Sequence, residues 1–277
     1  MAFPAPVKAA YWPSRATTSF PPSAIDTSLF THIYYAFLVP SDATYTFEIS
    51  TATAEVLSNF TNTLHQQNPP VKTLFAIGGA DAGSSVFSRM ASDANSRGVF
   101  IKSAIEVARK YGFDGMDLDW EFPDTQEGMD NLGKLFMEWR AAIKYEAEST
   151  RRAPLLLTAA VYFSVDILFN GVKYPAGSMD QNLDWVCAMC YDYHGPWDHP
   201  SKTGAPAALY DDSTTAVSVG PGNGVLTLAE VKAFNKDNGA KVVHDMETVS
   251  TYSYFQSTWI GYDDAITTTL KIGFAQA

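Results

Sequence analysis

Hydrophobic positions gather in short, bounded runs along the first part of the chain. These runs show little strict alternation of apolar and polar residues and are rich in β-branched and aromatic side chains, which indicates strands buried on both faces. Six of them lie at 7–12, 31–37, 71–79, 113–121, 154–163 and 183–193. Longer stretches with helical character separate them at 50–67, 84–112 and 130–150. One helical face of the last stretch carries Leu132, Leu135, Phe136, Trp139 and Ile143.

This alternation of strand and helix predicts βα units around a parallel sheet, and therefore an α/β fold. A (β/α)8 barrel of the TIM type and an open doubly wound sheet both fit the pattern. No Gly-x-Gly-x-x-Gly segment follows the first strand, which weakens the case for a dinucleotide-binding sheet. No Walker segment is present either, so the pattern does not indicate nucleotide phosphates as ligands.

The chain changes character after residue 194. A segment rich in Pro, Gly and Ser predicts a loop, and the residues beyond it mix one helical pattern, at 227–236, with two strand-like runs, at 241–247 and 251–263. We therefore predict four parts along the chain. They are barrel strands one to six with their helices at 1–194, a loop-rich connection at 195–224, a small α+β insertion at 225–263 and a truncated last helix at 264–277.

Composition and charge exclude some functions. The net charge of −11 and the absence of a Lys/Arg cluster argue against nucleic acid and against an anionic membrane surface as partners. No apolar run approaches the roughly 20 residues of a membrane span, and the N-terminal residues lack the pattern of a signal peptide. Cys187 and Cys190 have the spacing of a redox or zinc pair, but without a second such pair we expect two buried, unbridged thiols.

The run DGMDLDWEFP, residues 114–123, places acidic side chains inside one of the predicted buried strands. Alternate strand residues share a face, so Asp117, Asp119 and Glu121 point one way. The opposite face carries Met116, Leu118 and Trp120. Buried carboxyls that lie close together cannot all ionise, so one should stay protonated near neutral pH, as a general acid requires. Glu121 lies at the C-terminal end of the strand, which in a barrel opens onto the active site.

A metal site would use the same residue types, but no further cluster of His, Asp or Glu supplies the remaining ligands. We expect neither a metal nor any other cofactor. Gly78 and Gly79 end the third strand, where they would allow either a close approach of the backbone to a ligand or a simple tight turn. Several aromatic side chains fit sugar stacking as well as core packing. They are Trp12, Tyr162, Trp197 and Trp259.

The spacing Asp114-x-x-Asp117-x-Asp119-x-Glu121 closely resembles the catalytic signature of glycoside hydrolase family 18. The surrounding segments YGFDGMDLDWEFP, FTHIYYAF, AIGG and MCYDYHGPW, and the run over 227–264, are most similar to the plant class V chitinases. The resemblance covers nearly the whole chain. It implies a TIM barrel with a small α+β insertion, and hydrolysis of β-1,4-linked N-acetylglucosamine polymers such as chitin and chitooligosaccharides, with retention of configuration.

The resemblance also implies the role of each site residue. Glu121 would protonate the glycosidic oxygen, and the substrate's own acetamido oxygen would attack the anomeric carbon. Asp119 would hold the acetamido N–H, Asp117 would share a proton with Asp119, and Tyr191 would donate a hydrogen bond to the acetamido oxygen. The sugar site would be lined by Phe37, Met189 and Asp192. Asp114 would support the strand end. Relatives of this kind are secreted or vacuolar and act in plant defence, which sets the expected location and setting.

Two segments that the resemblance implies are not recognisable in the sequence. They are the seventh barrel strand, with its aromatic-Gly-Arg segment, and the eighth strand, whose Trp floors the site. The position before Ile-Gly-Gly is Ala76, where the family usually has Ser. We therefore expect an incomplete barrel with impaired hydrolysis. The alternatives are a catalytically weak or inactive lectin on the same scaffold, which would bind chitin or its oligosaccharides, and a fragment with no function of its own.

Overall fold

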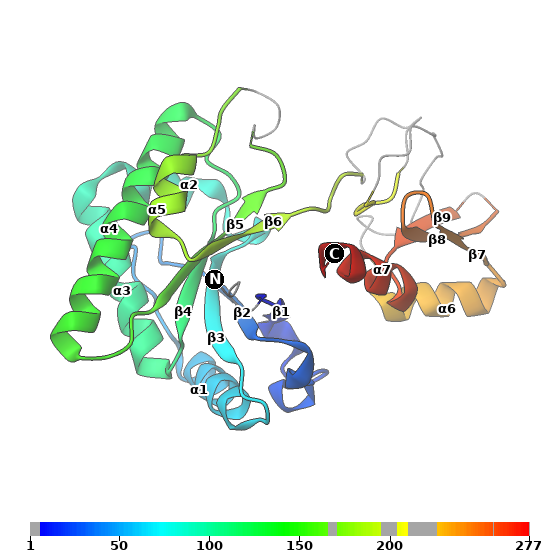
Figure 1. Cartoon of the computed structure of the whole chain (residues 1–277), viewed down its shortest axis with the longest axis horizontal. Helices are drawn as coiled ribbons and strands as arrows, with labels where there is room; N and C mark the ends of the chain where they lie inside the picture. The colour runs from blue at the N-terminus through cyan, green and yellow to red at the C-terminus, as the bar shows by residue number, and fades with distance from the viewer. Residues whose placement is uncertain (1–5, 166–170, 195–203, 210–225, 257, 277) are drawn as a thin grey trace. The chain divides into compact units, whose positions relative to one another are not determined.

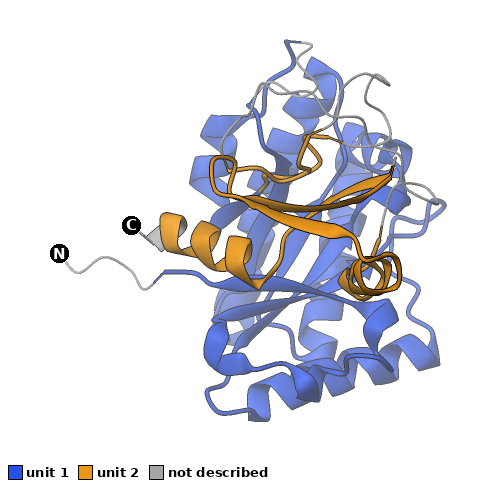
Figure 2. Cartoon of the chain, turned by 90° about the vertical axis from the view of Figure 1, so that its right-hand side faces the viewer, with its two compact units in different colours: residues 1–188 blue, residues 189–277 orange. Residues whose placement is uncertain are grey.

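The computed structural model describes residues 6–165, 171–194, 204–209, 226–256 and 258–276. The chain forms two compact units, which comprise residues 1–188 and 189–277 (Figure 2). Each unit has its own sheet, and each is described by itself below. None of the helices in the described ranges is long and apolar enough to cross a membrane.

The first unit is built on a parallel sheet whose strands follow one another in sequence order, β1-β2-β3-β4-β5-β6 (Figure 1). The strands are β1 (Ala9–Pro13), β2 (His32–Leu38), β3 (Lys72–Gly78), β4 (Gly115–Asp119), β5 (Leu156–Tyr162) and β6 (Trp185–Met189). Each lies within one of the six runs predicted from sequence, or within one residue of it. This sequential parallel order confirms the α/β prediction of the TIM-barrel type, and the described residues contain no seventh or eighth parallel strand.

Helices connect these strands and pack against the sheet. They are α1 (Thr51–Gln66), α2 (Ser84–Ser92), α3 (Ala94–Tyr111), α4 (Gln126–Thr150) and α5 (Ala176–Asn182), with short 3-10 turns at Ser14–Ala16, Pro22–Ala24, Thr27–Leu29 and Ala80–Ala82. The single helical stretch predicted at 84–112 is wrong in one respect. Asp93 interrupts it, because its side chain accepts a hydrogen bond from the Ser96 N–H and so caps the start of α3. The sequence pattern missed α5.

The core of this unit lies between the sheet and the helices. The α4 side chains predicted to share one face are all buried, and Trp139 packs edge-on against Phe100 of α3 at 5.1 Å between ring centroids. Two ion pairs fix the helices to one another at the rim. Arg97 of α3 makes a bidentate contact with Glu138 of α4, and Arg109 makes another with Glu146. Apolar packing and ion pairs therefore link α3 to α4 in the helical layer that covers the sheet.

The second unit contains a small antiparallel sheet, order β7-β8-β9, and two helices. The elements are α6 (Leu228–Asn238), β7 (Lys241–Asp245), β8 (Ser250–Phe255), β9 (Thr258–Tyr262) and α7 (Ala265–Gln276). The strand-like run predicted at 251–263 is two strands that form a hairpin, and Gln256 after β8 has a φ of 52°, in the left-handed region. Most of the predicted connection at 195–224 lies outside the described residues.

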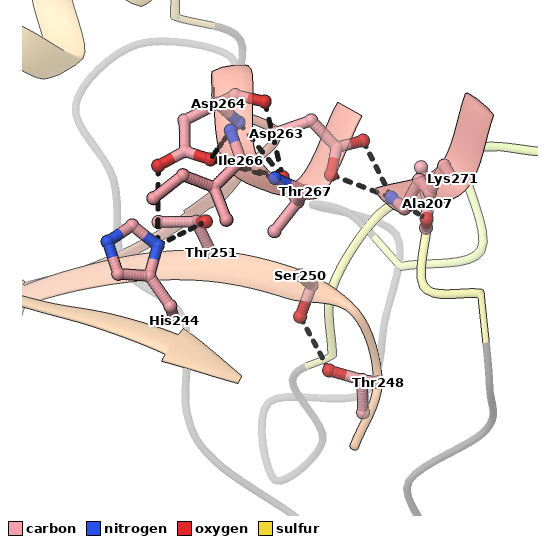
Figure 3. Close-up of polar contacts among 10 residues, drawn as sticks. All are labelled: Ala207, His244, Thr248, Ser250, Thr251, Asp263, Asp264, Ile266, Thr267 and Lys271. Carbon is pink, nitrogen blue, oxygen red and sulfur yellow. Dashed lines mark hydrogen bonds and ion pairs between the residues drawn. The ribbon is translucent and has the colours of Figure 1, made fainter. Parts of the chain in front are cut away.

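Polar contacts join α7 to this sheet (Figure 3). Asp264 caps the helix, since its Oδ1 accepts hydrogen bonds from the backbone N–H groups of Ile266 (2.9 Å) and Thr267 (3.1 Å). Its other carboxylate oxygen lies 3.3 Å from Nδ1 of His244 on β7. Lys271 lies 2.7 Å from both carboxylate oxygens of Asp263. The predicted last helix is thus part of the second unit, and Asp264 links its start to His244 of the sheet.

Candidate active site

The acidic run forms β4 and the residues that follow it. Asp117 and Asp119 lie in the strand, where 0% and 4% of their surfaces are exposed, and Glu121 follows two residues beyond its end. The alternate side chains are apolar and belong to the helix-facing core, as the period of two predicts. They are Met116, Leu118 and Trp120. The strand therefore presents its carboxyls to the interior of the curled sheet, and a solvated acidic edge is excluded.

Asp117 is held by two donors from other strands of the sheet, the adjacent β5 and the more distant β1. Thr158 Oγ1 of β5 donates to Asp117 Oδ1 at 2.6 Å, and Tyr11 Oη of β1 donates to Asp117 Oδ2 at 2.8 Å. Burial raises the pKa of Asp117 to about 6, and the hydrogen bonds from Thr158 and Tyr11 oppose that rise. Asp117 is thus fixed in place, with each of its oxygens accepting a hydrogen bond.

Asp119 is buried beside Glu121, and a hydrogen bond links the two carboxyls. Burial raises the pKa of Asp119, and the charges of Glu121 and Asp117 raise it further. A proton is therefore held between Asp119 and Glu121 near neutral pH, because two carboxylates in contact cannot both ionise. Within the described part of the chain, Asp119 Oδ1 is buried and has no hydrogen-bond partner. A buried carboxylate oxygen without a donor is costly, so it is available to a ligand N–H or O–H.

The glycines that end β3 are required by their contacts with the chain itself. Gly78 has a φ of 114°, and a Cβ on it would lie 2.0 Å from the carbonyl oxygen of Asp119. Gly79 donates its N–H to that same carbonyl at 2.9 Å, and a Cβ on Gly79 would lie 3.0 Å from the ring of Phe37. Gly78 and Gly79 therefore allow the backbone of β3 to come close to β4 and to the ring of Phe37.

Sequence reasoning did not find three of the residues around the carboxyls: Tyr11, Thr158 and Tyr174. Tyr174, in the segment between β5 and α5, accepts a hydrogen bond from the Tyr162 N–H at 2.9 Å. Burial raises its pKa to about 12, and the charges of Asp119 and Glu121 add to the rise, which places its hydroxyl near both. Thr158 could have been found from register, because it is directly opposite Asp117 in the β4–β5 ladder. No local signal marks Tyr11 or Tyr174.

Asp114 supports the start of β4, away from the other carboxyls. Its Oδ2 lies 2.9 Å from Nε2 of His65 and accepts a hydrogen bond of 2.8 Å from the backbone N–H of Thr73 on β3. Burial alone would raise the pKa of Asp114, but the hydrogen bonds from His65 and Thr73 outweigh it and lower the pKa. This carboxyl is therefore a structural anion.

Some predicted site residues belong to the second unit or lie elsewhere. Phe37, in β2, is 38% exposed in the first unit. Met189, Tyr191 and Asp192 belong to the second unit, where 47% of the Tyr191 surface is exposed and Asp192 has a φ of 58°. Their contribution to the sugar site stays a prediction. Trp197 lies outside the described residues.

For Trp12, the structure decides between the two roles that the sequence left open. Trp12 packs in the core, buried among the rings of Tyr35 and Phe60, and donates its indole N–H to the Phe20 carbonyl at 2.8 Å. One expectation from sequence is wrong. Cys190 is not buried, because it follows the end of β6; it is exposed, and Cys187 is half-buried. Both thiols are free. Across the described residues, no group of three or more His, Cys, Asp or Glu side chains has the arrangement of a metal site.

A parallel sheet of the TIM-barrel type, with coupled carboxyls at the C-terminal end of one strand, defines the class of a barrel glycoside hydrolase. The sequence supports this class, because the family model of glycosyl hydrolases family 18 matches residues 7–221. The chain belongs to this family, as its acidic motif predicted, and it is a glycoside hydrolase by descent.

The chain is similar to plant proteins over almost its full length. It is 44% identical to Nod factor hydrolase protein 1 and 42% identical to class V chitinase CHIT5b, both from Medicago truncatula, and each alignment covers 98% of this chain and 83% of the relative. The first alignment runs over 322 positions, which exceeds the 277 residues of the chain. That relative therefore carries internal residues that have no counterpart here, in line with the barrel segments that are not recognisable in the sequence.

Solved structures of the same family share the fold. A GH18 chitinase from Cycas revoluta in complex with (GlcNAc)3 matches with a TM-score of 0.89 at 36% identity, covering 98% of this chain and 92% of that chain. A chitinase-like agglutinin from Robinia pseudoacacia matches with a TM-score of 0.82 at 30% identity, covering 98% and 91%. The fold thus occurs in proteins named as enzymes and in a protein named as an agglutinin.

Proposed function

We propose that this protein hydrolyses β-1,4-linked N-acetylglucosamine polymers, chitin and its oligosaccharides, with retention of configuration and with assistance from the substrate. The observation that carries the proposal is the buried Asp119 Oδ1, which has no partner in the described residues and lies beside the proton shared with Glu121. An acetamido group offers the missing N–H donor. The names of the relatives support this substrate class, because they include class V chitinases and a chitinase solved with (GlcNAc)3.

The chemistry follows from where the shared proton goes. An acetamido N–H that donates to Asp119 Oδ1 favours the ionised form of Asp119, so the proton moves to Glu121. Glu121 then protonates the glycosidic oxygen while the acetamido oxygen attacks the anomeric carbon, and the C–O bond to the leaving sugar breaks. The resulting oxazolinium ion is stabilised by the Asp119 carboxylate. Water, deprotonated by Glu121, reopens the ring from the same face as the departed sugar, which gives retention.

Asp117 supports this transfer of the proton between Asp119 and Glu121. Its oxygens are held by Tyr11 and Thr158, so its charge stays close behind Asp119 and supports a proton on the Asp119–Glu121 pair. Tyr191 would donate to the acetamido oxygen and orient it toward the anomeric carbon. Phe37, Met189 and Asp192 would line the sugar-binding surface around the same ring.

The test is incubation with an N-acetylglucosamine hexamer, with products read by mass spectrometry. Wild-type protein should release shorter oligomers, and in H2(18)O the label should appear at the new reducing end. Glu121→Gln removes the acid but keeps the shape, so it should lower the rate at least a hundredfold. An exposed carboxyl on α4 offers a matched control, Asp130→Asn, which should leave the rate unchanged.

A second candidate is a lectin of the same family, and the structural match to an agglutinin favours it. Calorimetry with the hexamer decides between the two. Binding by both the wild type and Glu121→Gln, with an intact hexamer after prolonged incubation of the wild type, would establish the lectin and contradict the hydrolase. Shorter oligomers from the wild type alone would establish the enzyme.

A further inference from the structure

Trp185 of β6 reaches across the interior of the curled sheet to β2. In the sheet order, β3, β4 and β5 separate these two strands, so backbone pairing does not join them. The Trp185 ring packs edge-on against His32 at 4.8 Å between centroids, and its Nε1 donates to Tyr34 Oη at 2.9 Å. His32 and Tyr34 are alternate residues of β2 and share a face. Trp185 is therefore fixed at two points on the same strand.

Tyr34 connects this contact to Asp117. Its side chain is fully buried, and its ring stacks on Tyr11 with 4.6 Å between centroids and 16° between planes. Tyr11 is one of the two donors to Asp117. The Tyr34 hydroxyl also lies 3.8 Å from Cys187 Sγ of β6. Tyr34 thus packs against Tyr11, one of the two groups that hold the Asp117 carboxyl.

The direction of the hydrogen bonds adds to this. An indole N–H can only donate, so Trp185 occupies a lone pair of Tyr34 Oη and leaves the Tyr34 proton to point at Cys187 Sγ. These two contacts fix the orientation of the Tyr34 ring, on which Tyr11 is stacked. The titratable groups that face Asp117 from the surrounding strands are Tyr11 of β1, Tyr34 of β2, Asp119 of β4 and Cys187 of β6. None of these is a cation, so hydrogen bonds are what support its charge.

We propose that Trp185 is a positioning residue for the catalytic carboxyls, acting through Tyr34 on Tyr11, one of the two donors that hold Asp117. The proposal rests on the proposed hydrolase function. Without the indole N–H, Tyr34 turns more freely, and the Tyr11 hydroxyl, whose ring is stacked on Tyr34, donates less well to Asp117. Asp117 then ionises at higher pH and supports the shared proton on Asp119 and Glu121 less effectively.

The test uses Trp185→Phe, which keeps an aromatic ring against His32 and removes the N–H. We expect kcat on the hexamer to fall roughly fivefold with KM within twofold, and the acid limb of the pH–kcat profile to move to higher pH. Trp139→Phe is the matched control, because the Trp139 indole N–H is buried and has no partner in the described residues. It should lower the melting temperature and leave the pH profile unchanged.

Tyr34→Phe tests whether Trp185 acts on Asp117 through Tyr34. If Trp185 acts through Tyr34, the double variant has the kcat of Tyr34→Phe alone, and the two effects do not add. Additive effects would overturn the route, and a folded Trp185→Phe protein with wild-type kcat and pH profile would overturn the proposal.

A failure of the hydrolase function would be recognised separately, as a wild type without turnover. In that case the Asp117 carboxyl is titrated by carbon-13 NMR, with Asp117→Asn as the assignment standard. A higher Asp117 pKa in Trp185→Phe than in the wild type supports the positioning role without any need for turnover. An unchanged pKa overturns it.

Discussion

Thr158 Oγ1 donates a hydrogen bond of 2.6 Å to Asp117 Oδ1, so side chains as well as backbone join the fifth strand to the fourth. The two residues are directly opposite each other in the parallel ladder. This pairing, with Tyr11 on the other oxygen, lets the chain keep a carboxyl at 0% exposure in a sheet interior. The stabilising contacts offset part of the cost of burying the charge. The part of the cost that is not offset should be measurable as a loss of folding stability when Asp117 is ionised.

Replacement of Asp117 by Asn should stabilise the fold at neutral pH while it lowers activity. Because the folded pKa of Asp117 is raised from 3.8 to about 6, the ionised group costs stability that is absent below pH 3.8 and fully present above pH 6. That difference corresponds to roughly 1–3 kcal/mol. Urea unfolding at pH 7.5 and at pH 3.5 measures it, and the gain should be confined to the higher pH. A gain of equal size at both values would show that ionisation is not the cause.

Replacement of Gly78 by Ala should displace Asp119. The new Cβ would lie 2.0 Å from the Asp119 carbonyl oxygen, at a φ of 114° that side chains rarely adopt. We expect a loss of at least about 2 kcal/mol of stability and of most activity. Gly98→Ala is the control, because Gly98 lies inside α3 with open space around a Cβ, and it should gain roughly 0.5–1 kcal/mol. Thermal melts and hexamer hydrolysis, compared side by side, would contradict the prediction if Gly78→Ala matched the wild type.

Asp114 makes the start of β4 sensitive to acid. Its folded pKa is lowered, so its contribution to stability is present above the unfolded pKa near 4 and is lost as the pH falls through the folded value. Since the pair with His65 is about one-third exposed on each side, the effect should be at most about 1 kcal/mol. Asp114→Asn should lower stability at pH 6 and leave it unchanged at pH 2. Unfolding midpoints of the variant and of the wild type, compared at each pH, check this. An equal loss of stability at both pH values would point to lost packing instead.

Asp264 should stabilise the first turn of α7, the last helix of the second unit. Asp264→Ala removes the cap of α7 and the contact with His244, so we expect a loss of about 1 kcal/mol and faster amide exchange in the first turn of α7 (Figure 3). Asp264→Asn keeps the cap and removes the charge, so most of the protection should return. Hydrogen exchange followed by mass spectrometry resolves the region. Uniform exchange across both variants and the wild type would contradict a capping role.

Local pattern was enough to predict the six strands of the first unit, because buried parallel strands and their connecting helices differ in length and periodicity. It was also enough to find the carboxyl strand, since Asp117, Asp119 and Glu121 alternate with large apolar residues. Local pattern failed at Asp93, where a side-chain cap divides one helical stretch, and at the hairpin between β8 and β9. Both features depend on one or two residues, which a hydrophobic period does not register.

By itself, the sequence determined the order of the six strands in the first unit, the buried face of α4 and the acidic face of β4, because each depends on residues close together in the chain. Only the tertiary structure decided what surrounds the carboxyls. Tyr11 and Thr158 reach Asp117 from 106 and 41 residues away, and Trp185 reaches Tyr34 across 151 residues. No periodicity marks such pairs. The curl of the sheet brings them together, and the burial that results sets the pKa values on which the proposed chemistry depends.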